Sequence, residues 1–303
     1  MIVRPRPHWL HLLFVRRGSL LGRILPQQLA VLAIAMAVAW AHGRLWQWKV
    51  PLNAGAISLM GVSLAIFLGF RINASYDRYW EARKLWGLAL IASRNLARHL
   101  LTALAVEDEA RPLVRGLMAF AAAMRNQLRG QPATQGLDGL LPAGLLAVLP
   151  QQRSAPLAIA LWLGRELQAQ RRDGKLETIL AKQIEDTLDE LLAAWGGCER
   201  IAATPLPFTY SVILHRSVYT YCLLLPFGLV DGVGLATPLV VGFVSYTFFA
   251  LESLSDEIEE PFGQMPNDLP LDALVAGIQA SLLQLLGETP PPAPQPDDRF
   301  VLR

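Results

Sequence analysis

Long apolar stretches constrain the fold of this chain more than any other feature. Residues 24–43, 50–70 and 232–251 contain no Asp, Glu, Lys or Arg, and a fourth apolar stretch, 207–230, is interrupted by one His and one Arg. An α-helix of about 20 apolar residues spans the hydrocarbon core of a bilayer. The sequence therefore predicts an all-α integral membrane protein with four transmembrane helices, at approximately 24–43, 50–72, 207–230 and 232–252.

The second stretch differs from a simple lipid anchor. It contains three Gly, two Ser and Asn53. Small and polar residues in a membrane helix usually face other helices or water, because lipid offers their polar groups no partner. Apolar residues then continue at spacings of three and four beyond Phe70 with no helix breaker. We expect this helix to leave the membrane and enter the cytosol.

The remaining sequence predicts a helical cytosolic region at about 73–206 and 253–290. Its amphipathic helices are expected at 111–128, 155–171 and 176–195, with a Gly/Pro-rich loop at 130–144. The proline-rich end, from about 290 to 303, predicts a disordered tail. We interpret the whole of 1–303 as a single unit.

Positive charge near the first helix predicts the orientation of the chain in the membrane. The preceding segment contains no acid and five arginines: Arg4, Arg6, Arg16, Arg17 and Arg23. The next loop carries only Arg44 and Lys49. The positive-inside rule places the N-terminus in the cytosol, and four spans return the C-terminus there.

Enzyme and cofactor motifs are not found. The chain has no phosphate-binding loop, dinucleotide turn, HExxH or GxSxG. We expect no enzyme activity, no cofactor and no metal, and a net charge of +2 predicts no nucleic-acid partner. Cys198 and Cys222 lack metal-ligand spacing and are expected to be buried apolar residues. His8 and His11 are interpreted as part of an interfacial amphipathic helix, with a metal pair as the alternative.

His215 and Arg216 lie within an apolar segment, where an ionisable side chain exposed to lipid is costly. We expect a structural partner for them among the acids between 252 and 260, with a role in permeation as the alternative. These acids also indicate where the fourth helix leaves the membrane; they are Glu252, Asp256, Glu257, Glu259 and Glu260.

One face of the second helix carries a regular stripe. Val62, Ile66 and Phe70 are spaced i, i+4, i+8, and Asn73 and Asp77 continue the same face. If subunits surround an axis, rings of bulky apolar side chains form a hydrophobic constriction of the kind that gates channels. The alternative is that the three apolar residues pack against the first and fourth helices.

Several separated blocks resemble the bestrophin channels, particularly their bacterial branch. The main block is IFLGFRINASYDRYWEARKLWG at 66–87, and further blocks are MIVRPRPHWL at the start, GCERIAATPLPFTYSVILHR at 197–216, EIEEPFG at 257–263 and NDLPLDAL at 267–274. The similarity extends almost from end to end.

The resemblance implies a homopentamer with one axial pore. The family's neck then falls on Val62, Ile66 and Phe70, the residues that the spacing also selects. A second, cytosolic constriction is placed near Leu180, with Ile184 as a second candidate. Ordinary helix packing is the alternative for both.

Two departures from the animal bestrophins affect the expected ion. Gln-Met-Pro-Asn-Asp-Leu follows Glu260–Gly263, and this run lacks the clustered carboxylates of a calcium site. At the centre of the neck, Ile66 also stands where the animal channels have an aromatic residue. Asp77, Glu177 and Glu185, if they face the pore, would form negative rings that favour cations. Glu185 and Asp186 can equally belong to a solvated helix face.

The combined hypothesis is a pentameric channel of the bacterial inner membrane, surrounded by lipid, that conducts small monovalent cations such as sodium. An anion channel that conducts chloride is the close alternative. A non-conducting membrane scaffold or signalling protein is the second alternative.

Overall fold

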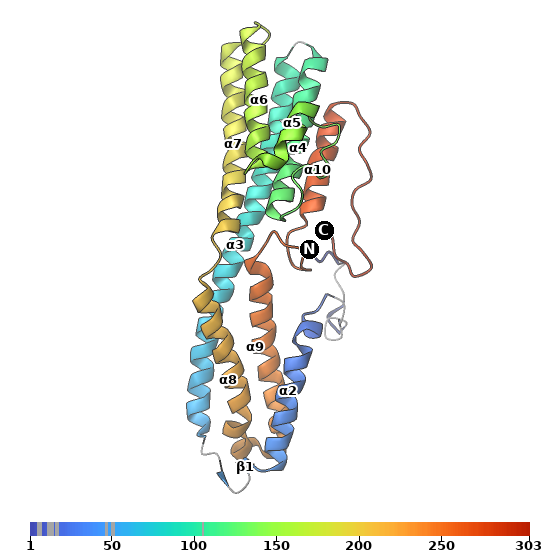
Figure 1. Cartoon of the computed structure of the whole chain (residues 1–303). Coiled ribbons are helices and arrows are strands. Elements are labelled where there is room, and N and C mark those ends of the chain that lie inside the picture. Colours follow the sequence, from blue (N-terminus) through green and yellow to red (C-terminus); the bar gives the residue numbers. More distant parts are fainter. Residues whose placement is uncertain (5–7, 11–14, 16–17, 46–47, 50–51, 105) are drawn as a thin grey trace. The chain divides into compact units, whose positions relative to one another are not determined.

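The computed structural model describes all residues except 5–7, 11–14, 16–17, 46–47, 50–51 and 105 (Figure 1). His11, Arg6, Arg16 and Arg17 therefore lie outside the described residues. The described helices are α2 (Leu21–Trp40), α3 (Ala54–Ala103), α4 (Glu107–Leu128), α5 (Ala143–Val148), η1 (Leu149–Gln151), α6 (Ala155–Arg172), α7 (Thr178–Ala203), α8 (Phe208–Val233), η2 (Gly234–Ala236), α9 (Thr237–Glu259) and α10 (Leu271–Leu285). A two-stranded antiparallel hairpin, β1 (Arg44–Leu45) and β2 (Trp48–Lys49), is the exception. The prediction of a helical protein is confirmed.

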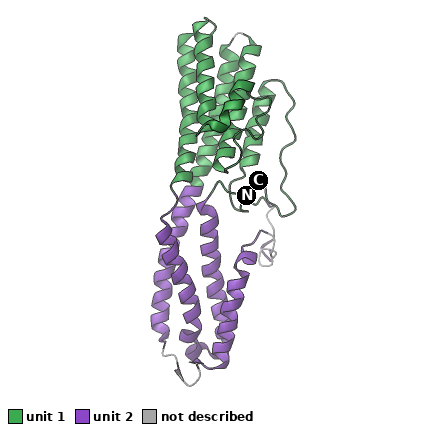
Figure 2. Ribbon diagram, in the orientation of Figure 1, with its two compact units in different colours: residues 1–3, 80–204, 261–303 green, residues 4–79, 205–260 purple. Residues whose placement is uncertain are grey.

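The chain divides into two compact units (Figure 2). Unit 1 comprises residues 1–3, 80–204 and 261–303, and unit 2 comprises residues 4–79 and 205–260. Helix α3 contributes its first part to unit 2 and its second part to unit 1. The uninterrupted helix from Ala54 to Ala103 confirms that the helical pattern continues beyond Phe70.

Unit 2 contains the apolar helices. By length and composition, three helical segments can cross a membrane: Leu21–Trp40, Ala54–Ala103 and Phe208–Glu259. The third is two helices, α8 and α9, because the turn η2 intervenes and Gly234 there has φ 58°, a value that favours glycine. The four predicted apolar segments thus correspond to α2, the first part of α3, α8 and α9.

The core of unit 2 is formed by all four of these helices. Its buried residues include Ile24 and Val31 on α2, Ile57 and Leu64 on α3, Leu214, Val218, Cys222 and Leu225 on α8, and Val241 and Phe249 on α9. Close approach between α8 and α3 depends on Gly228, because a Cβ there would overlap Cγ1 of Ile57 and lie 3.1 Å from its Cβ.

Three polar side chains of unit 2, Gln28, Ser58 and Ser63, find partners within its helices. The Gln28 amide is 7% exposed, donates to the Gly242 carbonyl at 2.9 Å and accepts from Ser245 at 3.2 Å. Ser58 and Ser63 donate to the carbonyls of Ala54 and Leu59, four residues earlier. These bonds satisfy polar groups that lipid would leave without a partner.

Unit 1 is built around α4. Eight consecutive α4 residues, 117–124, are buried, and the helix packs against α6, α7 and α10. The second part of α3 adds Ala82, Trp86 and Leu96 to the buried set. The predicted amphipathic segments at 111–128, 155–171 and 176–195 thus correspond to α4, α6 and α7.

The C-terminal segment has more order than the sequence suggested. Residues 288–296 form no helix or strand, but Val301 pairs with Ile2 in an isolated β-bridge and Leu302 donates to the Met1 carbonyl. The Asp297 carboxylate accepts from the backbone N–H groups of Arg299 and Val301, and these bonds lower the pKa of Asp297. Composition alone did not indicate these local bonds.

Two glycines of α8 provide a matched test of the α3–α8 contact. Gly228→Ala is expected to lower the free energy of unfolding by about 1–3 kcal/mol, the cost of overpacking a core. Gly232→Ala, where a Cβ meets nothing within 4 Å, is expected to be neutral or stabilising by less than about 1 kcal/mol. Thermal unfolding of both variants in detergent measures the difference; equal stabilities would contradict the close approach.

Candidate ion pathway

The predicted neck residues lie on one exposed face of α3. Val62, Ile66 and Phe70 are 59%, 53% and 62% exposed. Ile57, Leu64, Leu68, Arg71 and Ser75 are buried on the opposite face. In the single chain, more than half of each of these side chains is therefore left uncovered by the other helices.

The stripe continues with polar residues. Asn73 and Asp77 are both exposed and lie on the same face at helical spacing. Seven residues beyond Asp77, Lys84 is exposed on this face as well. Along this face of α3, the three apolar residues are thus followed by Asn73, then by the acidic Asp77 and then by the basic Lys84.

A buried ion cluster defines the opposite face of α3. Arg71 is 3% exposed and donates to Asp256 at 2.6 Å and to Glu259 at 3.1 Å. Arg78 donates to the Glu259 carbonyl at 3.1 Å, and the hydroxyls of Ser75 and Ser255 are 3.0 Å apart. These contacts hold α3 to the last turns of α9 and turn the stripe outward.

The other acids of α9 also have partners. Glu257 accepts from Arg23 of α2 at 3.3 Å, and Glu252, 5% exposed, lies 2.7 Å from Nδ1 of His215. The prediction of an acidic partner for His215 is confirmed. The helix α9 continues through these paired acids to Glu259, seven residues beyond its predicted end.

Arg216 differs from its neighbour. Its side chain is exposed, and no acid among the described residues pairs with it. The expected acidic partner is therefore found for His215 and not for Arg216.

The residues predicted to form the cytosolic constriction, at the start of α7, differ in how exposed they are. Leu180 is half-buried, while Ile184 is 1% exposed and lies inside unit 1. The most exposed large apolar residue here is Ile179, at 79%. Sequence analysis missed Ile179, because its neighbour Leu180 has the same character and only the helix orientation separates them.

The acidic candidates on α7 also differ. Glu177 is exposed at the N-terminus of α7, whereas Glu185 is half-buried and accepts from Gln168 of α6 at 3.0 Å. Asp186 pairs with Lys182 at 2.6 Å, and this hydrogen bond raises the pKa of Lys182. Asp186 thus lies on a solvated helix face.

Within the described part of the chain, no three His, Cys, Asp or Glu residues cluster as metal ligands. Cys198 and Cys222 are free and buried, as expected from the sequence. Burial raises the pKa of the Cys198 thiol to about 12 and thereby suppresses the reactive thiolate.

Removing the Arg71 side chain tests how much the ion cluster contributes to the stability of the fold. Arg71→Ala is expected to lower the free energy of unfolding by roughly 3 kcal/mol, because Glu259 loses its buried countercharge. Lys49→Ala, which removes the exposed 2.9 Å ion pair between Lys49 and Asp231, is expected to cost less than about 1 kcal/mol. Thermal unfolding in detergent compares them, and an Arg71 variant as stable as the Lys49 variant would contradict this assignment.

Comparisons with known proteins all indicate the same group. Residues 1–284 match the sequence model of the bacterial and fungal bestrophin protein family. A Salmonella typhi protein named voltage-dependent anion channel-forming protein YneE is 43% identical over 303 residues, covering 100% of both chains. The Escherichia coli K12 protein of that name is 42% identical over 299 residues, covering 99% of this chain and 98% of its own.

Solved structures agree with the sequence relatives. The crystal structure of a bacterial bestrophin homologue from Klebsiella pneumoniae superimposes with a TM-score of 0.85 at 41% identity. It covers 88% of this chain and 100% of that one. A second match, described as a crystal structure of a membrane protein, has the same TM-score at 40% identity and the same coverage.

Proposed function

This chain belongs to the bacterial and fungal bestrophin family of membrane channel proteins, and we propose that it forms a homopentameric ion channel whose pore is lined by α3. The family consists of channels and not of enzymes, in agreement with the sequence-based expectation. The proposal goes further in naming the pore-lining residues, the ion and the number of subunits. The pentamer itself derives from the family resemblance.

The observation that carries the proposal is the orientation of α3. Its bulky stripe of Val62, Ile66 and Phe70 is exposed, although Arg71 and Leu68 on the opposite face are buried. Only 22% of the residues in the apolar window of α3 are buried, so lipid or further subunits must cover the rest. With α3 around a common axis, the stripe forms three apolar rings, a constriction that stops ions by dewetting when narrow and conducts when wetted.

The second constriction is proposed at the start of α7. Leu180 remains a candidate, and its exposed neighbour Ile179 is added because 79% of it is accessible to a partner or to a pore. Ile184 is not used, since a residue that is 1% exposed within its own subunit cannot line a water-filled path. Glu185 is likewise not used, because its carboxylate faces α6.

We place the channel in the bacterial inner membrane with both termini in the cytosol. Arg4 precedes α2, Arg23 lies in the first turn of α2, and the first acid of the whole chain is Asp77. This excess of positive charge supports a cytosolic N-terminus.

The proposed ion is a small monovalent cation such as sodium. Asp77 and Glu177 are exposed, and five copies of each around an axis would make negative rings that attract cations. The α9 acids Glu252, Asp256, Glu257 and Glu259 are engaged by Arg23, Arg71 and His215, which supports a channel without a calcium clasp. The anion-channel names of the relatives favour chloride as the second candidate.

Ring-widening substitutions test the pore assignment. In planar bilayers that contain only this protein, Ile66→Ala is expected to raise single-channel conductance, because it removes apolar volume from the neck. Leu29→Ala, a comparably exposed position on α2, is expected to leave conductance unchanged. For the cytosolic constriction the corresponding changes are Ile179→Ala and Leu180→Ala, with Leu161→Ala on α6 as control.

Unchanged currents in Ile66→Ala, Ile179→Ala and Leu180→Ala would contradict the named constrictions. A purified, folded protein that carries no current at all would favour the scaffold or signalling alternative.

The reversal potential in asymmetric sodium chloride shows whether the channel conducts cations or anions. A cation channel reverses toward the sodium equilibrium potential, and Asp77→Asn is expected to reduce this shift because it removes a ring of negative charge. Asp108→Asn, an exposed acid on α4, is the matched control and is expected to have no effect. Reversal toward the chloride equilibrium potential would overturn the cation proposal and support the anion alternative.

A further inference from the structure

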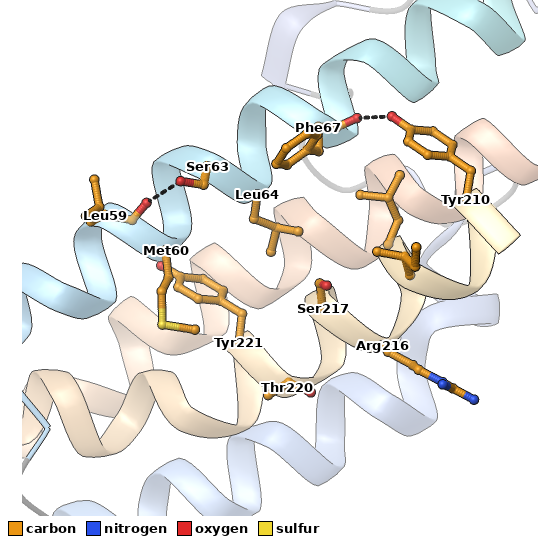
Figure 3. A pocket seen from close by; sticks show the side chains of 12 residues that line it. Leu59, Met60, Ser63, Leu64, Phe67, Tyr210, Arg216, Ser217, Thr220 and Tyr221 are labelled. Atoms are coloured by element: carbon orange, nitrogen blue, oxygen red, sulfur yellow. Dashed lines mark hydrogen bonds between the residues drawn. The ribbon is translucent and has the colours of Figure 1, made fainter.

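A groove between α3 and α8 lies beside the proposed pore stripe (Figure 3). It encloses about 720 Å³ within unit 2. Leu59, Met60 and Phe67 line it from α3, and Ile213 and Ser217 line it from α8. The four apolar side chains among them are 44% to 70% exposed in the single chain, so the groove is accessible from outside the subunit.

Two tyrosines of α8 bound the groove along its length. The Tyr210 hydroxyl donates to the Phe67 carbonyl at 2.9 Å. At the other end Tyr221 lies against Gly61, where a Cβ would stand 2.5 Å from the tyrosine hydroxyl oxygen. Tyr221 is itself held by an edge contact with Phe248, with ring centroids 5.4 Å apart. The groove is thus a fixed depression between two helices.

One cation stands at the edge of this apolar surface. Arg216 contributes to the lining, and its guanidinium extends away from α3 in Figure 3. Arg23, Arg71 and His215 each pair with an acid of α9, whereas Arg216 pairs with no acid in the described part of the chain. An ionisable residue within a membrane helix usually has a partner or a function.

The depth of Arg216 follows from contacts within unit 2. His215, the preceding residue, meets Glu252, and Glu257 one to two turns further along α9 meets Arg23 at the start of α2. The beginning of α8 therefore lies at the same end of unit 2 as Arg23, in the first turn of α2. That end faces the cytosol in the proposed orientation.

We propose that this groove binds an anionic phospholipid of the cytoplasmic leaflet, with an acyl chain between α3 and α8 and the phosphate at Arg216. Apolar lining along most of the groove and one cation at its edge, on α8 between Tyr210 and Tyr221, match the two parts of such a lipid. Basic positions between membrane helices on the cytoplasmic side are recognised sites for anionic headgroups. The proposal rests on the proposed membrane insertion and orientation, and not on conduction.

Charge favours a lipid over a second copy of this chain as the occupant. Residues 1–76 contain no Asp or Glu, and neither do 208–230 of α8 or 237–251 of α9. A neighbouring copy packed along the groove would therefore offer Arg216 no carboxylate from the apolar part of any helix. Glu252, the acid at this depth, is 5% exposed and held by His215, which leaves a lipid phosphate as the anion proposed for Arg216.

Lipid retention after reconstitution tests the proposal. The protein is incorporated into nanodiscs with equal amounts of phosphatidylglycerol and phosphatidylcholine, extracted in mild detergent, and its bound lipids are counted by native mass spectrometry. Wild type is expected to retain phosphatidylglycerol preferentially, and Arg216→Gln is expected to reduce this preference about five-fold, the factor typical of one basic residue near an anionic surface. Arg216→Lys is expected to keep most of it.

Two further variants separate charge from shape. Ser63→Trp fills the groove and is expected to lower retention of both lipids, while Arg172→Gln, an exposed arginine at the end of α6, is expected to change neither. Equal preference for phosphatidylglycerol in wild type and Arg216→Gln would overturn the proposal. A second result would also overturn it: the Ser217→Cys variant cross-links efficiently to a second copy in the bilayer, and the Ser63→Trp variant loses no bound lipid.

The lipid assay and the current measurement are independent. A protein that carries no current but retains phosphatidylglycerol in an Arg216-dependent manner supports the lipid site while contradicting the channel. A conducting protein without lipid preference supports the channel and overturns the lipid site.

Discussion

The burial of Arg71 is the constraint on which the arrangement of unit 2 depends. A guanidinium that is 3% exposed requires countercharges, and Asp256 and Glu259 supply them from the last turns of α9. Removing charges from water is costly, so the pair persists only with good geometry and additional hydrogen bonds. Arg71 is therefore held by two carboxylates, and the neighbouring contacts of Arg78 with the Glu259 carbonyl and of Ser75 with Ser255 join α3 to α9 beside it.

This ion cluster also decides which face of α3 is left open. Arg71 lies on the side of the helix opposite Val62, Ile66 and Phe70, so its pairing with α9 directs those three residues away from their own subunit. Exposed bulky residues on an apolar helix must then be covered by lipid or by other subunits. The proposed pore follows from that requirement together with the family membership.

Two exposed surfaces of α3 have different characters. The stripe is uniform and apolar and continues into Asn73 and Asp77, as a path for ions requires. The flanking groove shares α8 as its second wall and includes Arg216. Different occupants are therefore proposed for them, ions for the first and a phospholipid for the second, although both belong to one helix.

The sequence by itself determined the helical class, the apolar segments and the continuous α3, because hydrophobic length and helical periodicity are local properties of the chain. It also identified the Val62, Ile66 and Phe70 stripe, since spacing alone places these residues on one face. The acidic partner of His215 was anticipated from the cost of an unpaired charge near lipid.

Only the tertiary structure decided which candidate residues are open and which are buried. Ile184 and Glu185 resemble Leu180 and Glu177 in sequence, yet packing of α7 within unit 1 buries Ile184 and directs Glu185 to Gln168, while Ile179 stays exposed. Likewise, the pairing of Arg71 and His215 with acids of α9 joins side chains far apart in sequence, and no such acid meets Arg216 within the described part of the chain. The physical reason is that burial and ion pairing are set by contacts between helices, which the period of one helix does not specify.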